Sequence, residues 1–258
     1  MASGLPEGVQ PLAAFDADGT LWAGDIGETA FLRGFHEGVI LPSTVEGPVL
    51  AWAERWGLEL PEEPSLAFPL LCHLCEGERI LEQLPAHACL DDARADLYGM
   101  QAWAYTGRTA LEVEAYGERL FAAGFERTLF SWAPELLAAL RERGIEVVIA
   151  SASHRDLVVP GAARLGIARE RVYGSLPRTC PQGTYVPTPG CALYGDAKAR
   201  VVEEHLAGRG GGKPLLAFGD SVAWTDRALL ASALMPVAVR PTGVHLEEAW
   251  QRGLRILC

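Results

Sequence analysis

The sequence has few basic residues and no long hydrophobic run. Lysine and arginine number 22 against 33 aspartate and glutamate residues, which gives a formal net charge of −11 over 258 residues. Nucleic-acid-binding surfaces need clustered lysine and arginine, so this balance argues against a nucleic-acid partner. No apolar run approaches the length that spans a bilayer, so we also expect no membrane anchor. A phosphorylated substrate would have to be attracted by local groups, because the global field repels it.

Cysteine is also sparse, with six residues in the chain. That number is too low for the disulfide framework of a small secreted protein. Cys72 and Cys75 have the spacing of a zinc-binding pair, but a zinc site needs four ligands and the sequence has no second such pair, so we expect buried thiols. The first residues lack the basic and apolar segments of a signal peptide, and a cytoplasmic location is therefore expected.

What the sequence does contain is a series of short apolar runs of strand length. They cover residues 12–15, 146–150, 215–218 and 236–239. Helix-like segments lie before or between them, at 134–143, 155–165, 197–207 and 225–231, and Gly144 is placed to end the first of these. Strands that alternate with helices form a parallel sheet covered on both faces. The sequence therefore predicts a doubly wound α/β fold.

The region from 26 to 125 contains no convincing strand. Segments 50–56, 93–104 and 110–123 are typical of helices, and prolines such as Pro42 and Pro48 are expected to break the pattern. An insertion after the first strand lies above the carboxyl edge of the sheet, where ligands bind in such folds. We therefore predict a core domain formed by residues 1–25 and 126–258, with a helical cap domain formed by residues 26–125.

Two carboxylates follow the first apolar run. Asp16 and Asp18 are followed by Gly19, which permits a turn and exposes backbone amides. One carboxylate at such a strand end can attack phosphorus and bind a cation. Its neighbour can donate a proton to the leaving oxygen and then accept one from water. An acidic turn without chemistry is the alternative interpretation.

Three more polar motifs come later in the chain. Ser151 follows the second run, and its hydroxyl together with the next amide, that of Ala152, can hold a phosphoryl oxygen. A helix cap is the alternative role for a serine here, although Ser153 is nearer to the helix. Lys198 would offset the charge of the phosphate and of the attacking carboxylate. Acidic side chains at and after the third run would complete an oxygen-rich magnesium site; these are Asp220 and Asp226.

These four motifs, in this order, resemble those of the haloacid dehalogenase superfamily, and the branch of phosphoserine phosphatases with a helical cap is the most similar. The resemblance implies that Asp16 forms an aspartyl-phosphate and that Asp18 is the general acid and base. It implies a phosphate site and a magnesium ion. The implied phosphate ligands are Ser151, Ala152, Lys198 and Gly19, and the implied magnesium ligands are Asp16, Asp18 through its backbone carbonyl, Asp220 and Asp226.

The fourth motif departs from the pattern of the family. The family has two residues between the serine and the second acid, whereas Trp224 and Thr225 are additional here and Asp226 is the next acid. The place of Asp226 therefore depends on how these two residues fold. A catalytically impaired protein that binds ligands on the same fold is the alternative that this departure keeps open.

Two acidic residues that follow the second aspartate of the first motif are candidates for binding the head group of the substrate. In phosphoserine phosphatases an acid seven positions after the second aspartate contacts the substrate amine, and Asp25 occupies that position, with Glu28 one helical turn later. The resemblance thus predicts a small phosphorylated metabolite with an amine, such as phosphoserine. Acids that complement a helix dipole are the alternative.

Two questions about the head group stay open. An aromatic cage would favour phosphocholine or phosphoethanolamine instead, and the candidate cage residues are Trp22, Trp52, Trp56 and Trp103. The arginine that would bind a substrate carboxylate is Arg33, Arg79 or Arg94. The sequence does not predict the oligomeric state.

Overall fold

The computed structural model describes residues 5–57, 90–188 and 190–258, and its centre is a six-stranded parallel sheet with the order β3-β2-β1-β4-β5-β6. The strands are β1 (Val9–Phe15), β2 (Glu146–His154), β3 (Val172–Ser175), β4 (Lys213–Gly219), β5 (Met235–Val239) and β6 (Arg255–Leu257). The predicted doubly wound fold is confirmed. The strand order reverses between β1 and its neighbours β2 and β4, and ligands bind at the carboxyl ends of strands at such a point.

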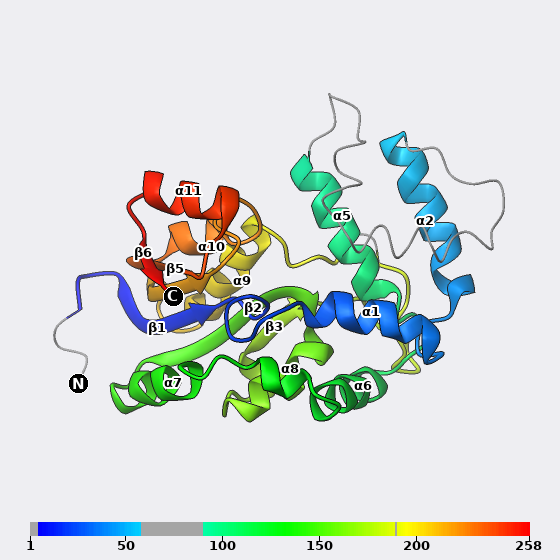
Figure 1. The fold of residues 1–258 in the computed structure, drawn as a ribbon, viewed down its shortest axis with the longest axis horizontal. Coiled ribbons are helices and arrows are strands. Elements are labelled where there is room, and N and C mark those ends of the chain that lie inside the picture. The colour runs from blue at the N-terminus through cyan, green and yellow to red at the C-terminus, as the bar shows by residue number, and fades with distance from the viewer. Residues whose placement is uncertain (1–4, 58–89, 189) are drawn as a thin grey trace.

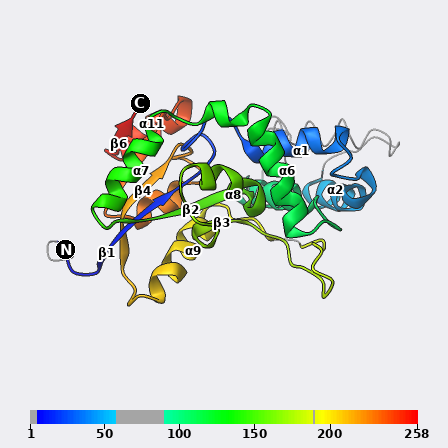
Figure 2. The ribbon, with the colours of Figure 1, turned by 90° about the horizontal axis from the view of Figure 1, so that it is seen from below.

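Helices cover both faces of the sheet (Figure 1). Alternate residues of a strand point to opposite faces, so Ala13 and Phe15 of β1 belong to one hydrophobic cluster while Leu12 and Ala14 belong to the other. The first cluster includes residues of α7 (Ala133–Glu142) and α8 (Arg155–Arg164), whose face is turned toward the viewer in Figure 2. The second includes residues of α9 (Asp196–Ala207), α10 (Arg227–Ser232) and α11 (Gly243–Gln251).

The described residues between β1 and α7 form helices and no strand. They are α1 (Ile26–His36), α2 (Pro42–Trp56), α5 (Leu90–Trp103), α6 (Ala110–Ala122) and the 3₁₀ turn η2 (Phe125–Thr128). Helix α2 begins at Pro42 and continues through position 48, so the predicted break at Pro48 is wrong. Helices α2 and α5 stand together beyond the carboxyl ends of the strands (Figure 1). The Cys72 and Cys75 pair lies outside the described residues.

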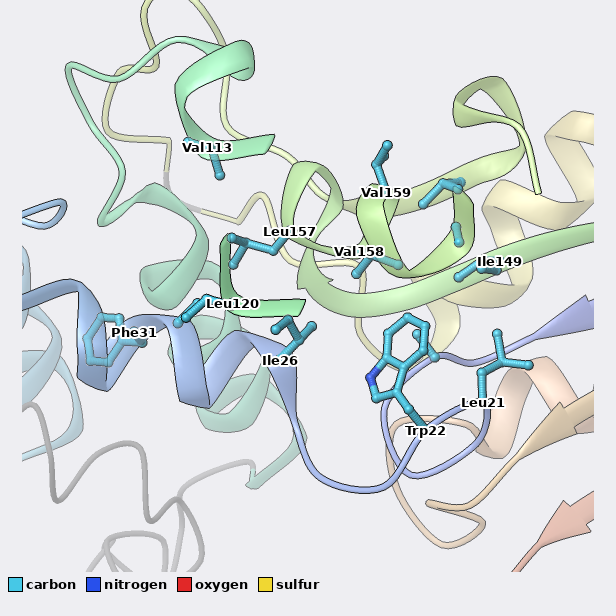
Figure 3. Packing of buried hydrophobic residues seen from close by; sticks show 14 of the residues in the cluster. Leu21, Trp22, Ile26, Phe31, Val113, Leu120, Ile149, Leu157, Val158 and Val159 are labelled. Carbon is cyan, nitrogen blue, oxygen red and sulfur yellow. The ribbon is translucent and has the colours of Figure 1, made fainter. Parts of the chain in front are cut away.

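Trp22 fixes the segment that follows β1. Its side chain is fully buried, and its ring meets the ring of Phe121 edge to face at 5.5 Å. Figure 3 shows Trp22 beside Val158 of α8 and close to Ile149 of β2. Gly161 of α8 makes room for it, because a Cβ there would lie 2.8 Å from the Trp22 ring. This packing holds the turn after Asp16 and Asp18 against the sheet.

The long connection between β3 and α9 joins the core to the inserted helices. The backbone of Tyr185 in this connection donates to the carbonyl of Arg108 at 2.8 Å and accepts from the amide of Gly107 at 2.9 Å. The Tyr185 hydroxyl also donates to Asp156, a fully buried carboxylate at the start of α8 that accepts hydrogen bonds from Arg169 as well. The segment before α6 is therefore tied to the start of α8.

In the described part of the chain, no helix combines the length and the apolar character needed to cross a membrane. The described cysteines, Cys180, Cys191 and Cys258, are free thiols.

Candidate active site

Four polar side chains converge at the carboxyl ends of β1 and β4. Asp16 directly follows the first of these strands and Asp220 directly follows the second, while Lys198 comes from α9 and Asp226 precedes α10. The ammonium group of Lys198 donates to Asp16 Oδ1 at 2.5 Å and to Asp226 Oδ1 at 2.6 Å. These three side chains are buried, with Lys198 only 1% exposed. Residues 210 positions apart in the chain thus share one ion-pair network.

Burial and mutual repulsion shift the pKa values of this cluster. Burial raises the pKa of Asp16 well above its ordinary value, and the charge of Asp226 adds to the rise while Lys198 opposes it. Burial followed by repulsion from Asp226 raises the pKa of Asp220 to about 7. Burial by itself lowers the pKa of Lys198, but Asp16 and Asp226 outweigh it and the net shift is upward. Lys198 is therefore a fixed positive charge among excess carboxylates.

Asp16, Asp220 and Asp226 are arranged to share a cation. One carboxylate oxygen from each of them can be chosen so that all three lie within 4.8 Å of one another. An all-oxygen donor set of this kind suits magnesium, which prefers carboxylate and water ligands. Thr20, which the sequence analysis did not assign, places its hydroxyl 3.4 Å from both Asp16 Oδ2 and Asp220 Oδ1. The carboxylate set fits the predicted metal.

Gly19 is required because the segments that follow β1 and β4 approach each other closely. Its backbone has φ +70°, a conformation that favours glycine, and a Cβ at this position would lie 2.3 Å from Asp220 Oδ2. Any larger residue would therefore displace the carboxylate that completes the cluster. This role is steric, and it comes in addition to the exposure of backbone amides predicted for Gly19.

The altered fourth motif still delivers Asp226 to the cluster. The amide of Asp226 donates to the carbonyl of Ser221 at 3.1 Å, and the amide of Ser221 donates back to Asp226 Oδ2 at 3.0 Å. The residues between them, Trp224 and Thr225 included, form a turn that projects from this closed ring. The two additional residues are thus accommodated without moving Asp226 away from Lys198.

Asp18 is held by four donors. Its Oδ1 accepts from the indole of Trp22 at 2.8 Å and from the amide of Ile26 at 2.7 Å. Its Oδ2 accepts from Ser153 Oγ at 2.7 Å and from Ser151 Oγ at 3.4 Å. Burial raises its pKa, and the donated hydrogen bonds limit the rise. The carboxyl is fixed beside Asp16 in a site whose burial raises its pKa.

The residues of the second motif differ in their exposure to the site. Ser151 is fully buried and accepts a hydrogen bond from the Ser153 amide, whereas Ala152 and Ser153 line the cavity described below. The expected cap role of Ser153 is wrong, because His154 caps α8 through its ring nitrogen and the amide of Asp156. The Ser153 hydroxyl is directed to Asp18 instead. The sequence contains no signal that separates these two roles of Ser153, which are to cap the helix and to donate to Asp18.

Comparison with known proteins shows the family of the chain. The family model described as haloacid dehalogenase-like hydrolase matches residues 13–231, which span the whole cluster. The chain belongs to this hydrolase family. No protein of curated function matches the chain.

Solved structures share the fold of the hydrolase at low sequence identity. A protein of unknown function from Bordetella pertussis Tohama I has a TM-score of 0.64 and 21% identity, over 96% of this chain and 97% of its own. A conserved protein of unknown function from Anaerococcus prevotii DSM 20548 has a TM-score of 0.66 and 15% identity, over 98% and 86%. A phosphoserine phosphohydrolase-like protein from Francisella tularensis subsp. tularensis SCHU S4 has a TM-score of 0.54 and 16% identity, over 95% and 94%.

A cavity of about 390 Å³ opens beside the carboxylates of the hydrolase. Asp25 and Glu28 both line it, and Asp25 also caps α1 by accepting from the amide of Glu28 at 2.8 Å. The helix-start role and the cavity-lining role of Asp25 are therefore compatible. Burial, followed by repulsion from Asp18 and Glu28, raises the pKa of Asp25 well above its ordinary value. Two acidic side chains are thus neighbours on the wall of the cavity.

The aromatic residues of the cavity are not those considered from the sequence. The four tryptophans named there are buried and none of them lines the cavity, whereas Tyr98 and Trp224 do. Among the candidate arginines, Arg33 pairs with Glu37 on the exposed face of α1 and Arg79 lies outside the described residues. Arg94 places its guanidinium 4.0 Å from the ring centre of Trp224. Helix periodicity cannot reveal these neighbours, because they come from distant segments.

Removing one carboxylate of the cluster tests its electrostatics. At about pH 8 an ionised Asp220 destabilises the metal-free fold, because its pKa is raised to about 7 and its ionised form is disfavoured by burial. The contribution of Asp220 to stability is thus full below the unfolded pKa and is lost as the pH rises through about 7. We expect Asp220→Asn to stabilise the metal-free protein at about pH 8 by on the order of 2 kcal/mol, with a smaller effect at about pH 5, because the penalty for ionised Asp220 grows between about pH 4 and about pH 7.

Thermal unfolding with and without Mg²⁺ measures this effect. The wild type should gain melting temperature when Mg²⁺ is added, because a ligand that binds only the folded state stabilises it. The Asp220→Asn variant should lose most of that gain. Glu204→Gln, an exposed substitution on α9, is the matched control and should behave as the wild type. Equal melting temperatures of Asp220→Asn and wild type at both pH values would contradict the assignment.

Proposed function

We propose that the hydrolase is a magnesium-dependent phosphatase that cleaves a small phosphomonoester through an aspartyl-phosphate on Asp16. The observation that carries this proposal is the Lys198 ammonium bound to Asp16 Oδ1 at 2.5 Å, beside a set of three carboxylates that fits a divalent cation. Phosphoryl transfer depends mainly on positioning and on neutralising charge. Two cationic groups around one buried carboxylate supply that neutralisation.

In the first step, an oxygen of Asp16 attacks phosphorus and the bond from phosphorus to the alcohol oxygen breaks. Asp18 donates its proton to that oxygen, which leaves as the alcohol. Two N–H groups occupy Asp18 Oδ1 and can only donate, so the transferable proton belongs on Oδ2, where Ser153 and Ser151 lie. The raised pKa of Asp18 supports its role as an acid.

In the second step, Asp18 accepts a proton from a water molecule. The water oxygen forms a bond to phosphorus, the bond from Asp16 to phosphorus breaks, and inorganic phosphate is released. Lys198 keeps Asp16 ionised for the next cycle and offsets charge on the phosphoryl oxygens. Amides near Gly19 and Ala152, with the Ser151 hydroxyl, are the proposed further phosphate contacts. Ala152 lines the cavity, which favours its amide for this role.

Asp16, Asp220 and Asp226, with the backbone carbonyl of Asp18, are the groups that would hold magnesium. A magnesium ion bound there supplies positive charge that offsets the charge of the transferring phosphoryl group. The fit rests on the donor chemistry, since one oxygen from each of the three carboxylates can be chosen so that all three lie within 4.8 Å of one another. We also propose that residues 26–125 act as a cap over a core of residues 1–25 and 126–258, in a cytoplasmic enzyme.

The proposed head group of the substrate is an amine. Asp25 and Glu28 both line the cavity, and two carboxyl groups there suit a cationic group such as the ammonium of phosphoserine. Tyr98 and Trp224 add aromatic surface to the same cavity, and aromatic rings attract methylated ammonium groups. This observation favours phosphocholine or phosphoethanolamine as the second candidate.

A phosphate-release assay over these substrates tests the proposal. Phosphoserine, phosphoethanolamine and phosphocholine are compared with glycerol phosphate, which has no amine. We expect Mg²⁺-dependent release that stops in excess chelator, and a preference for the amine substrates that Asp25→Asn reduces by raising KM. Hydrolysis that persists in chelator would remove the metal from the proposal, and no release from any phosphomonoester would remove the phosphatase itself.

A further inference from the structure

Two pairs of stacked side chains form a wall at one side of the active-site cavity. In the first pair, the guanidinium of Arg94 lies over the ring of Trp224, 4.0 Å from its centre. In the second pair, the rings of Tyr98 and Tyr194 stack with centres 5.5 Å apart and an angle of 28° between their planes. Each pair combines one residue of α5 with one residue of the core.

The spacing of the α5 residues explains how one helix supplies both pairs. Arg94 and Tyr98 are four positions apart, so they project from the same face of the helix. Their partners come from separate places in the core, since Tyr194 precedes α9 and Trp224 belongs to the turn before α10. In Figure 1, α5 lies above the strands of the sheet, as α9 and α10 do. The wall therefore forms only when α5 is seated on the core.

The wall separates two cavities. Tyr98 lines the active-site cavity of about 390 Å³, and Tyr194 lines a polar cavity of about 1020 Å³ on the other side. Trp224 lines both. Its neighbours in sequence divide in the same way, because Thr225 lines the smaller cavity and Ala223 lines the larger one. The indole of Trp224 is thus a partition between the two spaces.

His245, which also lines the active-site cavity, holds Trp224 in place. His245 of α11 meets the Trp224 ring edge to face at 4.5 Å, and its Nδ1 accepts a hydrogen bond from the amide of Ala223 at 3.1 Å. The turn itself is closed by the hydrogen bonds between Ser221 and Asp226. Thr225 Oγ1 is buried and has no hydrogen-bond partner among the described residues.

We propose that this wall limits the size of the head group that the active site accepts, with Trp224 as the specificity-determining residue. The inference rests on the proposed phosphatase function and adds a selection rule to it. Trp224 and Thr225 are the two residues that extend the fourth motif, so the extension supplies the side chains that close the cavity. The substrate class that fits is a phosphomonoester whose alcohol is small, with a cationic group facing Asp25 and Glu28.

Truncating Trp224 tests the rule. Trp224→Ala removes the partition and joins the cavities, while Trp224→Phe keeps an aromatic ring in place. Phosphoserine and phosphotyrosine carry the same amine and carboxylate and differ in bulk. We expect Trp224→Ala to raise the ratio of kcat/KM for phosphotyrosine over phosphoserine by at least about tenfold, as is usual when a pocket wall sets selectivity. Trp224→Phe should change it by less than about threefold.

The controls separate the wall from the chemistry. Trp250→Ala removes an indole that is 67% exposed on α11, and it should leave the ratio unchanged. Tyr194→Ala opens the second pair and should raise the ratio in the same direction as Trp224→Ala. A ratio that stays constant in folded Trp224→Ala protein overturns the proposal.

Binding distinguishes a failure of the wall from a failure of the phosphatase. If the wild type hydrolyses neither compound, the proposed function is wrong, and the ratio of the two dissociation constants is then measured by calorimetry. A wall that selects by size shifts this ratio in the same direction whether or not a bond is broken. Failure of both compounds to bind, or an unchanged ratio, overturns the wall as a selector.

Discussion

Asp16→Asn should reduce phosphate release by at least about 10⁴-fold, since an amide is a poor nucleophile and its loss removes the covalent step. The side chain keeps its shape, and the fold should be retained. Burial raises the pKa of Asp16 above its ordinary value, so the ionised carboxylate costs stability in the metal-free protein at neutral pH. The variant should therefore be inactive without being less stable. Single-turnover release of phosphate from the best substrate of the wild type measures the first effect.

A matched substitution controls for the change in charge. Asp196→Asn alters an exposed aspartate at the start of α9, two residues from Lys198, and should leave turnover close to that of the wild type. In the wild type, brief exposure to substrate followed by acid quenching should trap a phosphorylated peptide that contains Asp16. Asp16→Asn should trap none. Turnover near the wild-type rate in Asp16→Asn would exclude the mechanism.

Lys198→Met should have the largest effect on stability. Lys198 is 1% exposed and neutralises two buried carboxylates, at 2.5 Å and 2.6 Å from Asp16 and Asp226. Removing one partner of a buried ion pair leaves uncompensated charge, which costs about 3 to 5 kcal/mol. For a chain of this size that loss lowers the melting temperature by on the order of 10 °C. Catalysis should be lost as well, because the phosphoryl oxygens lose their cation.

The pH dependence identifies the cause of this destabilisation. Without Lys198 the pKa of Asp16 should rise further. Acid then neutralises the repulsion between the buried carboxylates, so the deficit relative to the wild type should shrink from about pH 8 to about pH 5. Lys213→Met, which removes an exposed lysine at the start of β4, is the control. Urea unfolding at both pH values gives the comparison. A deficit that is absent, or that is independent of pH, would show that the network is not held by charge.

The wall and the catalytic cluster differ in how far the sequence predicts them. Asp16 and Asp220 follow apolar runs, and the carboxyl ends of parallel strands share one edge of the sheet. Tyr98 and Arg94 have no such marker, because a tyrosine and an arginine on an amphipathic helix are ordinary residues there. Their partners, Tyr194 and Trp224, lie in connections whose paths depend on the packing of α9, α10 and α11.

Local sequence also misassigned some details for an identifiable reason. Ser153 is a suitable helix cap by position, but the buried carboxylate of Asp18 needs a donor and the Ser153 hydroxyl supplies it at 2.7 Å. The proline at position 48 predicts a break, yet α2 continues from Pro42 to Trp56. Strands β3 and β6 are only four and three residues long, which is too short for a periodic pattern. In each case a tertiary contact or a short length outweighs the local preference.

The sequence by itself determined the doubly wound sheet, the order of the motifs and the carboxylates at the strand ends. These features follow from the spacing of the apolar runs. A strand that is buried on both faces consists of a few consecutive apolar residues, so the local sequence is enough to identify it. Only the tertiary structure decided that Asp226 reaches Lys198 across the extended turn, that Thr20 and Ser153 belong to the site, and that Trp224 divides two cavities. Such contacts join segments separated by tens to hundreds of residues, and the packing of whole helices against the sheet sets their distances.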